Sequence, residues 1–179
     1  GLGAAMARML ARHGAAVFLT DIDEASVAAV AAAINAESGA TVAWSAQHNV
    51  REEARWPVLL ERAVGVMGGL SVLINNAGIG ATGGVESLPL KDWQRVMGVN
   101  VDAVYFGCKY ALPWLRQGQP ASIINISSMA AFKIDPEYTV YNASKAAVAS
   151  LSKSVAVDCA RQKLDIRCNS IHLAFIRTG

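Results

Sequence analysis

The stretch SVLINNAG at residues 71–78 decides which fold this chain is expected to have. Its first half, from Ser71 to Ile74, is a short, nearly all-apolar run that follows a pair of glycines. Such runs are typical of strands that are buried on both faces, as in parallel sheets. The asparagines that follow place polar side chains where this strand ends.

Outward from this stretch, short apolar strands alternate with helical segments along the chain. Strands are expected at residues 15–20, 41–45, 71–74, 122–126 and 165–171. Helices are expected at residues 4–13, 24–38, 52–67, 91–117 and 138–161, with an interruption around Pro113. This alternation predicts a parallel sheet covered by helices on both faces, in a single domain that spans residues 1–179.

Polar residues stand at the ends of the expected strands, and these are Asp21, Asn49, Asn76, Ser128 and His172. The carboxyl ends of parallel strands meet at one edge, where open α/β sheets bind their ligands. The sequence therefore predicts one polar binding edge.

Composition excludes several classes of protein. Hydrophobic residues make up 53% and charged residues 17% of the 179, with a formal net charge of +2. This balance indicates a globular protein and argues against nucleic acid or a membrane surface as a partner. No apolar run approaches the roughly 20 residues that cross a bilayer. The three cysteines (Cys108, Cys159 and Cys168) read as buried thiols of a cytoplasmic protein, and the scattered histidines predict no metal site.

The chain opens with Gly1-Leu2-Gly3, directly before a segment of helical spacing, and a short strand then leads to Asp21. Glycines let a pyrophosphate approach the backbone at a helix N-terminus, where unpaired N–H groups favour anions. An acid about 20 residues further on can bind the hydroxyls of an adenosine ribose, and it repels the extra phosphate of NADP. From these residues alone, a glycine-rich turn beside a solvated aspartate is an equal alternative.

Tyr141 and Lys145 lie four positions apart in the expected helix at residues 138–161, which contains no glycine or proline. Positions i and i+4 share one face of a helix, and an ammonium beside a phenol stabilises the phenolate. The pair is therefore a suitable acid/base device. Taken alone, an amphipathic tyrosine beside a solvated lysine is the commoner interpretation of this spacing.

Together these motifs resemble those of the short-chain dehydrogenase/reductase family, nearly from end to end. The matching residues are Gly1-Leu2-Gly3, Asp21, Asn75-Asn76-Ala77-Gly78, Asn100, Ser128 and Tyr141-x-x-x-Lys145. Ser128 lies thirteen residues before Tyr141, which is the separation that the family uses. The resemblance implies an α/β, Rossmann-type doubly wound parallel sheet flanked by helices, here lacking the first strand and the C-terminal part.

The resemblance also implies a catalytic set of Asn100, Ser128, Tyr141 and Lys145. Tyr141 would be the general acid/base, and Lys145 would hold the nicotinamide ribose and stabilise the phenolate. Ser128 would hydrogen-bond the substrate oxygen, and Asn100 would anchor a water that links Lys145 to solvent. The neighbouring Ser127 is the main ambiguity, and the thirteen-residue spacing favours Ser128.

The cofactor implied by the resemblance is NAD rather than NADP, because Asp21 is followed by Ile22 and not by an arginine. Its implied contacts are Leu2, Gly3, Asp21, Ile22, Asn49, Val50, Asn76, Ala77, Gly78, Tyr141, Lys145, Ile176 and Thr178.

The chain departs from the family pattern in three places. Asn49 stands where the family commonly has aspartate, and Leu173-Ala174 replace the usual Pro-Gly after the last strand. The Pro-to-Leu and Gly-to-Ala changes remove a fixed φ and a close backbone approach, so the nicotinamide end of the site is expected to differ. The family's first strand and C-terminal part are also absent. The chain is therefore expected to be a fragment of a longer enzyme that does not fold stably alone.

The implied activity is NAD-dependent oxidation or reduction of a secondary alcohol or ketone. The stretches at residues 105–108 and 166–172 resemble hydroxysteroid and cyclic-alcohol dehydrogenases of the family. Three alternatives stay open: a non-catalytic NAD-binding protein of the same fold, a 3-oxoacyl-thioester reductase-like member, and a nucleotide-sugar epimerase or dehydratase. The family pairs the Tyr141 and Asn100 helices between subunits, so a homodimer or homotetramer is expected.

Overall fold

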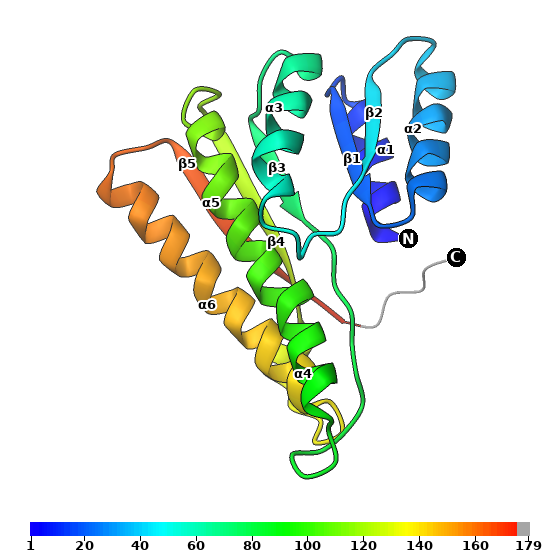
Figure 1. Cartoon of the computed structure of the whole chain (residues 1–179). Coiled ribbons are helices and arrows are strands. Elements are labelled where there is room, and N and C mark those ends of the chain that lie inside the picture. Colours follow the sequence, from blue (N-terminus) through cyan, green and yellow to red (C-terminus); the bar gives the residue numbers. More distant parts are fainter. Residues whose placement is uncertain (175–179) are drawn as a thin grey trace. The chain divides into compact units, whose positions relative to one another are not determined.

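The computed structural model describes residues 1–174 in two compact units, the first spanning Gly1–Leu70 and the second beginning at Ser71 (Figure 1). Both units alternate helices with parallel strands, in the order that the sequence predicts. No helix of the described residues is long and apolar enough to cross a membrane.

The first unit pairs two strands and covers them with helices. Its elements are α1 (Leu2–Arg12), β1 (Val17–Asp21), α2 (Glu24–Ser38), β2 (Ala43–Gln47) and α3 (Arg55–Met67). β1 and β2 pair in parallel, from Val17 opposite Ala43 to Asp21 opposite Gln47. The core packs Val17 and Ala43 with Ile34 of α2. Because the two strands run parallel, their carboxyl ends form one edge.

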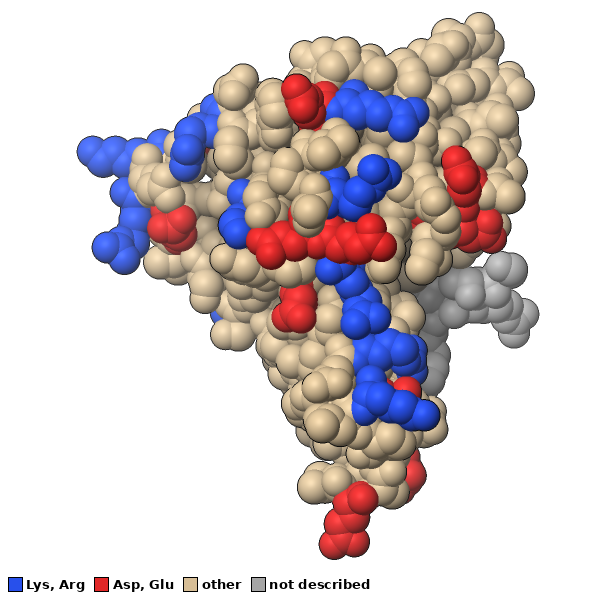
Figure 2. Space-filling view, in the orientation of Figure 1, with Lys and Arg blue, Asp and Glu red and all other residues tan. Residues whose placement is uncertain are grey.

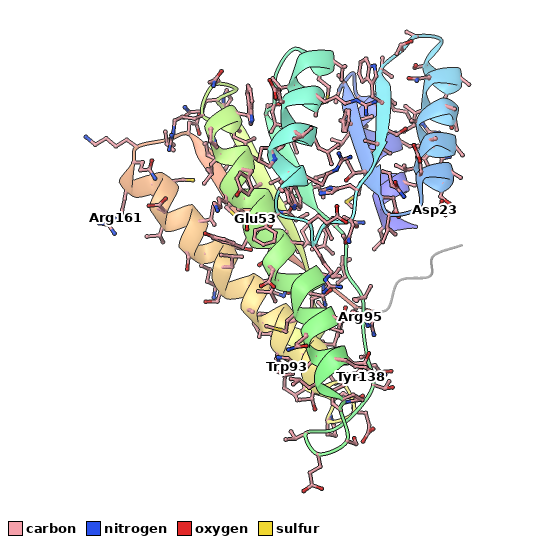
Figure 3. The ribbon with its side chains drawn as sticks, viewed as in Figure 1. Asp23, Glu53, Trp93, Arg95, Tyr138 and Arg161 are labelled. Atoms are coloured by element: carbon pink, nitrogen blue, oxygen red, sulfur yellow. The ribbon has the colours of Figure 1, made fainter. Side chains whose placement is uncertain are left out.

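Two aspartates shape the turn that leads from β1 into α2. A side-chain oxygen of Asp21 accepts a 3.1 Å hydrogen bond from the backbone N–H of Asp23. Asp23 in turn caps α2, because its carboxylate accepts from the backbone N–H of Ser26 at 3.1 Å. Such caps satisfy N–H groups that a helix leaves unpaired at its start. Figure 3 shows Asp23 at this end of α2, and the cap thereby fixes the backbone that carries Asp21.

The second unit holds a sheet of parallel strands in the order β3–β4–β5. Its elements are β3 (Val72–Asn75), α4 (Leu90–Met97), the π-helix η1 (Gly98–Asp102), α5 (Ala103–Leu115), β4 (Ala121–Ser128), the 3₁₀ turn η2 (Met129–Ala131), α6 (Thr139–Arg161) and β5 (Ile166–Leu173). α5 and α6 lie against this sheet and contact each other (Figure 1). The register of β4 and β5 runs to Ser128 opposite Leu173, so both strands end at the same edge.

Two buried asparagines fix how β3 and β4 pair. Asn75 lies opposite Asn125, and its amide nitrogen donates a 2.8 Å hydrogen bond to the Asn125 side-chain oxygen. Asn125 then donates to the hydroxyl of Ser152 on α6 at 2.9 Å. Buried polar groups are costly unless they are paired, so a shifted register would leave these amides without partners. The network therefore selects one alignment of strands that are otherwise apolar.

The predicted alternation of parallel strands and helices in a Rossmann-type arrangement is confirmed. The strands form two hydrogen-bonded sheets, β1–β2 and β3–β4–β5. The assignment of residues 1–179 to a single domain stays a prediction.

The predicted interruption around Pro113 is wrong, because Pro113 lies inside α5. Proline removes one N–H from the helix ladder, and α5 ends two residues later, so little of the helix depends on that bond. The break in this segment occurs earlier, where Gly98–Asp102 forms a π-helix between α4 and α5. Single π-turns inside α-helices occur frequently at functional sites.

Candidate active site

The strongest candidate for an acid/base site is the pair Tyr141 and Lys145, one turn apart on α6. The Lys145 ammonium nitrogen lies 5.5 Å from the centre of the Tyr141 ring. Lys145 is only 4% exposed, and its ammonium donates a 2.8 Å hydrogen bond to the main-chain carbonyl of Ile126 on β4. Burial lowers the pKa of Lys145 to about 8, since a charged group loses its hydration there. At neutral pH Lys145 therefore still carries its charge beside the phenol ring.

Gly78 brings the backbone of the loop after β3 close to this lysine. A Cβ atom at position 78 would lie 3.2 Å from the Lys145 ammonium nitrogen and 3.6 Å from the side-chain oxygen of Asn100. The first distance is tighter than ordinary van der Waals contact, so a larger residue would displace the end of Lys145. The short distance to Lys145 thus explains why the last residue of the Asn-Asn-Ala-Gly motif, Gly78, has no side chain.

Asn100 lies in the π-helix and is almost completely buried. Its side-chain oxygen accepts from the backbone N–H of Ile79, and its amide donates to the Ile79 carbonyl, both at 2.9 Å. The same amide donates to Ser144 Oγ at 2.9 Å, and that hydroxyl donates to the carbonyl of Tyr141 at 2.8 Å. These bonds link the loop after β3 to the α6 backbone that carries Tyr141. The water-holding role of Asn100 stays a prediction.

Ser128 is the last residue of β4 and is half-buried in extended backbone. Its Oγ accepts a 3.1 Å hydrogen bond from the backbone N–H of Ala130 and donates to the Leu173 carbonyl at 3.4 Å. Ser127 is buried, and its Oγ donates to the carbonyl of Lys145 at 2.9 Å. Ser127 is therefore committed to α6, whereas Ser128 holds its hydroxyl proton in a long bond that a substrate oxygen could replace.

Apolar side chains follow Ser128 in the segment that joins β4 to α6. Phe132 is 65% and Ile134 is 64% exposed, and Met129 and Tyr138 also reach solvent. Figure 3 shows Tyr138 just before the first turn of α6. Exposed apolar groups close to a polar site are typical of ligand-binding surfaces.

In the first unit, the predicted nucleotide residues lie at the carboxyl ends of the strands: Asp21 is the last residue of β1, Ile22 follows it, and Asn49 follows β2. A hollow of about 400 Å³ lies at these ends, lined by Ile22, Gln47, Asn49, Glu52 and Arg55. Asn49 donates to the Glu52 carboxylate at 3.1 Å, and Gln47 donates to the Ile22 carbonyl at 3.2 Å. The predicted Val50 adjoins this group, and its carbonyl accepts from the indole N–H of Trp56 at 3.0 Å.

Sequence reasoning missed Gln47, Glu52 and Arg55 in this hollow. A usable signal existed, because all three flank the predicted Asn49: Gln47 is the last residue of β2, Glu52 lies in the loop that follows and Arg55 begins α3. In the second unit, sequence reasoning missed the bonds that Asn100 makes to Ser144, inside the Tyr141-x-x-x-Lys145 motif, and to the backbone of Ile79, directly after Gly78.

The remaining predicted cofactor residues lie in two places. Leu2 and Gly3 occupy the first turn of α1, which follows Gly1. Asn76, Ala77 and Gly78 follow β3 directly. Ile176 and Thr178 lie outside the described residues.

The family model for short chain dehydrogenases matches residues 1–179. The NADP-dependent (R)-specific alcohol dehydrogenase of Lentilactobacillus kefiri is 35% identical, over 99% of this chain and 70% of that protein. The 3-beta-hydroxysteroid dehydrogenase of Comamonas testosteroni is 34% identical, over 96% of this chain and 65% of that protein. A crystal structure of a short chain dehydrogenase/reductase from Burkholderia phymatum in complex with NAD has a TM-score of 0.86 at 31% identity, over 94% of this chain and 60% of that one. The chain thus spans about two thirds of the length of the relatives that it matches.

Proposed function

The chain belongs to the short-chain dehydrogenase family of oxidoreductases that act on hydroxyl groups, and on this premise we propose that it interconverts a secondary alcohol and a ketone, with Tyr141 as the general acid/base. The observation that carries the proposal is the buried Lys145 ammonium 5.5 Å from the Tyr141 ring. An ammonium group near a phenol stabilises the phenolate form that would take up the substrate proton.

The roles of the chain's own residues follow from their contacts. In oxidation, Tyr141 takes the proton from the substrate hydroxyl, and in reduction it returns that proton to the carbonyl oxygen. Ser128 exchanges its 3.4 Å bond to Leu173 for a bond to the substrate oxygen, and this stabilises charge as it develops. Asn100 and Ser144 hold the α6 backbone at Tyr141, so that the phenol keeps its position.

Each unit carries groups that suit one part of a nicotinamide dinucleotide. The first turn of α1 offers unpaired N–H groups to a pyrophosphate, and the hollow at Ile22, Gln47, Asn49, Glu52 and Arg55 has room for an adenine. Gly78 leaves space beside Lys145, which would hold the nicotinamide ribose. A bound cofactor of this kind supplies the hydride chemistry.

We further propose NAD rather than NADP as the preferred cofactor. The Asp21 carboxylate is exposed at the end of β1, where it would accept the ribose hydroxyls and repel a 2′-phosphate. Arg55 lines the hollow that begins at the next residue, Ile22, but Glu52 lines it too and carries the opposite charge. One relative is NADP-dependent and one similar structure holds NAD, so this preference rests on Asp21 itself.

We propose as substrate an apolar secondary alcohol with a cyclic or steroid-like body, which would contact the exposed apolar residues Met129, Phe132, Ile134 and Tyr138. These side chains follow Ser128 in sequence and would lose contact with water when such a substrate binds. The curated relatives include a hydroxysteroid dehydrogenase, which is consistent with this class.

We also propose that the protein is a cytoplasmic homodimer or homotetramer. α6 buries Val148 and Cys159 on one side, and its other side carries a shallow hollow that includes the exposed Val157. The three cysteines of the chain are free and buried, as in proteins of reducing compartments. Light scattering of the full-length protein tests the assembly, and a monomer would contradict it.

The activity itself is tested by incubating the full-length protein with NAD and a panel of secondary alcohols, from small aliphatic to cyclic and steroidal ones. We expect NADH absorbance to rise, with the highest kcat/KM for the larger apolar alcohols. NAD binding without turnover of any alcohol or ketone would instead indicate a non-catalytic member of the fold. A strong preference for 3-oxoacyl thioesters would contradict the proposed substrate class.

A further inference from the structure

His172, on β5, has no role in the site as derived so far, yet it contacts the residue that we assign to the substrate oxygen. Its Nδ1 lies 3.2 Å from the main-chain carbonyl oxygen of Ser128, and its Nε2 lies 2.9 Å from Ser170 Oγ. The imidazole also packs on Phe132, with ring centres 4.7 Å apart. One side chain thus joins the end of β4, the strand β5 and the segment that follows Ser128.

The partners of the ring determine which nitrogen carries the proton in neutral His172. The Ser128 carbonyl can only accept a hydrogen bond, so Nδ1 must donate to it. Nε2 is then the acceptor, and the hydroxyl of Ser170 donates to it. Ser170 therefore holds the tautomer that the contact with Ser128 needs, in the way that the outer partner of a ring nitrogen commonly does.

This contact lies at the end of the β4–β5 ladder, where the pairing of the two strands ends. Ser128 is the final residue of β4, opposite Leu173, while Ser127 is opposite His172. The His172 side chain therefore contacts the carbonyl of Ser128, one residue beyond its register partner Ser127. The Ser128 hydroxyl is retained in the same direction by the Leu173 carbonyl, but at 3.4 Å. The Ser128 hydroxyl oxygen is itself fixed by the Ala130 N–H at 3.1 Å, so only its proton, in the long bond to Leu173, can be redirected toward a substrate.

We propose that His172 is a positioning residue for Ser128: its Nδ1–H holds the Ser128 peptide so that the hydroxyl meets the substrate oxygen. The inference rests on the proposed function, because it assigns the contact with the substrate oxygen to Ser128. It adds a second consequence, since the Phe132 ring on His172 couples the position of Ser128 to the apolar segment beside it. Errors of about 1 Å in such a group are known to reduce rates substantially.

A matched pair of variants in the full-length enzyme separates this role from simple packing. Asparagine and leucine have nearly the same size, and both lose the ring that packs on Phe132. The amide of His172→Asn can replace the Nδ1–H donor, whereas His172→Leu has no donor. We expect kcat for alcohol oxidation to fall about tenfold in His172→Leu and less than about threefold in His172→Asn, with KM for NAD within about twofold in both.

The variants are then repeated in a Ser128→Ala background, because a residue that acts through Ser128 has nothing left to position there. In that background the difference in kcat between His172→Leu and His172→Asn should vanish. Equal losses in His172→Leu and His172→Asn would overturn the inference, since ring packing would then explain them. An undiminished difference in the Ser128→Ala background would overturn it as well.

A measurement on the unmodified enzyme covers the case in which the leucine variant does not fold. Nitrogen NMR of His172 in its neutral form should show the proton on Nδ1. A proton on Nε2 would contradict the proposal, because Nδ1 could then not donate to Ser128. If Ser128→Ala and Tyr141→Phe both keep full activity, the proposed function fails; if they lose activity and His172→Leu does not, only this inference fails.

Discussion

The ammonium group of Lys145 on α6 donates a 2.8 Å hydrogen bond to the main-chain carbonyl of Ile126 on β4. Ser127, the next residue along β4, returns a 2.9 Å bond from its hydroxyl to the carbonyl of Lys145. The two bonds cross between the same pair of elements and fix the depth at which α6 lies on the sheet. The ammonium is thereby held at Ile126, two residues before the end of β4.

The buried charge of Lys145 makes stability depend on pH. Burial lowers the pKa of Lys145 to about 8 in the folded protein, against about 10.4 in an unfolded chain. Below pH 8 both states are protonated and the folded state bears the full cost of the buried charge. As pH rises from about 8 to about 10.4 the folded state loses its proton first, so the cost is relieved by up to about 3 kcal/mol.

Urea unfolding of the wild type and of Lys145→Met at several values of pH checks this. The methionine keeps most of the volume and removes the charge, so the other titrating groups cancel in the comparison. We expect the stability of the wild type relative to Lys145→Met to increase between about pH 8 and about pH 10. A difference that does not change with pH would mean that the lysine is not buried as described.

Gly78→Ala should reduce activity more than it reduces stability. The added Cβ would lie 3.2 Å from the Lys145 ammonium nitrogen, and the end of a lysine side chain can move away at little cost. We expect the free energy of unfolding to change by less than about 1 kcal/mol and kcat to fall about tenfold or more. The matched control is Gly65→Ala in α3, where a Cβ meets no atom within 4 Å. Equal activity of the two variants would contradict the claim that a side chain at position 78 displaces the end of Lys145.

Asp21→Ala should narrow the preference for NAD over NADP. Removing the carboxylate deletes an acceptor for the ribose hydroxyls and the charge that repels a 2′-phosphate, so KM for NAD should rise about tenfold. The control is Asp23→Ala, two positions away, which removes the cap of α2 and should cost about 1 kcal/mol of stability without changing cofactor preference. Unchanged kinetics with both cofactors in Asp21→Ala would rule out this role.

Asn125→Ala should destabilise the second unit. The substitution removes the oxygen that accepts from the Asn75 amide and the amide that donates to the Ser152 hydroxyl, both in a buried environment, which costs about 1 to 3 kcal/mol. Asn169→Ala on the neighbouring strand is the control, because Asn169 is exposed. Thermal unfolding of both variants makes the comparison, and similar melting temperatures would show that the network does not stabilise the sheet.

Local patterns in the sequence predict much of this arrangement. The apolar runs identify β3 and β4, and the i, i+4 rule brings Tyr141 and Lys145 onto one face of α6. Both follow from residues close together in the chain. The thirteen-residue separation of Ser128 and Tyr141 required the family resemblance, since no local rule relates a strand end to a helix.

The contacts that position these groups could not be predicted in the same way. The bonds from Lys145 to Ile126 and from His172 to Ser128 join residues that are 19 and 44 positions apart. They exist only because the β4–β5 register and the packing of α6 bring the partners together. The π-helix at Gly98–Asp102 was missed for another reason, because a helical periodicity looks the same whether or not one turn is wider.

The most direct test of the central claim compares wild type with Tyr141→Phe in NAD-dependent oxidation of the best secondary alcohol from the panel. Phenylalanine keeps the ring beside Lys145 and removes only the hydroxyl that would exchange the proton. Tyr105→Phe, on α5, is the matched control and should behave as the wild type. We expect kcat of Tyr141→Phe to fall at least about a hundredfold, as is usual when a general acid/base is lost. Equal rates in Tyr141→Phe and the wild type would contradict the assignment of Tyr141 as the acid/base.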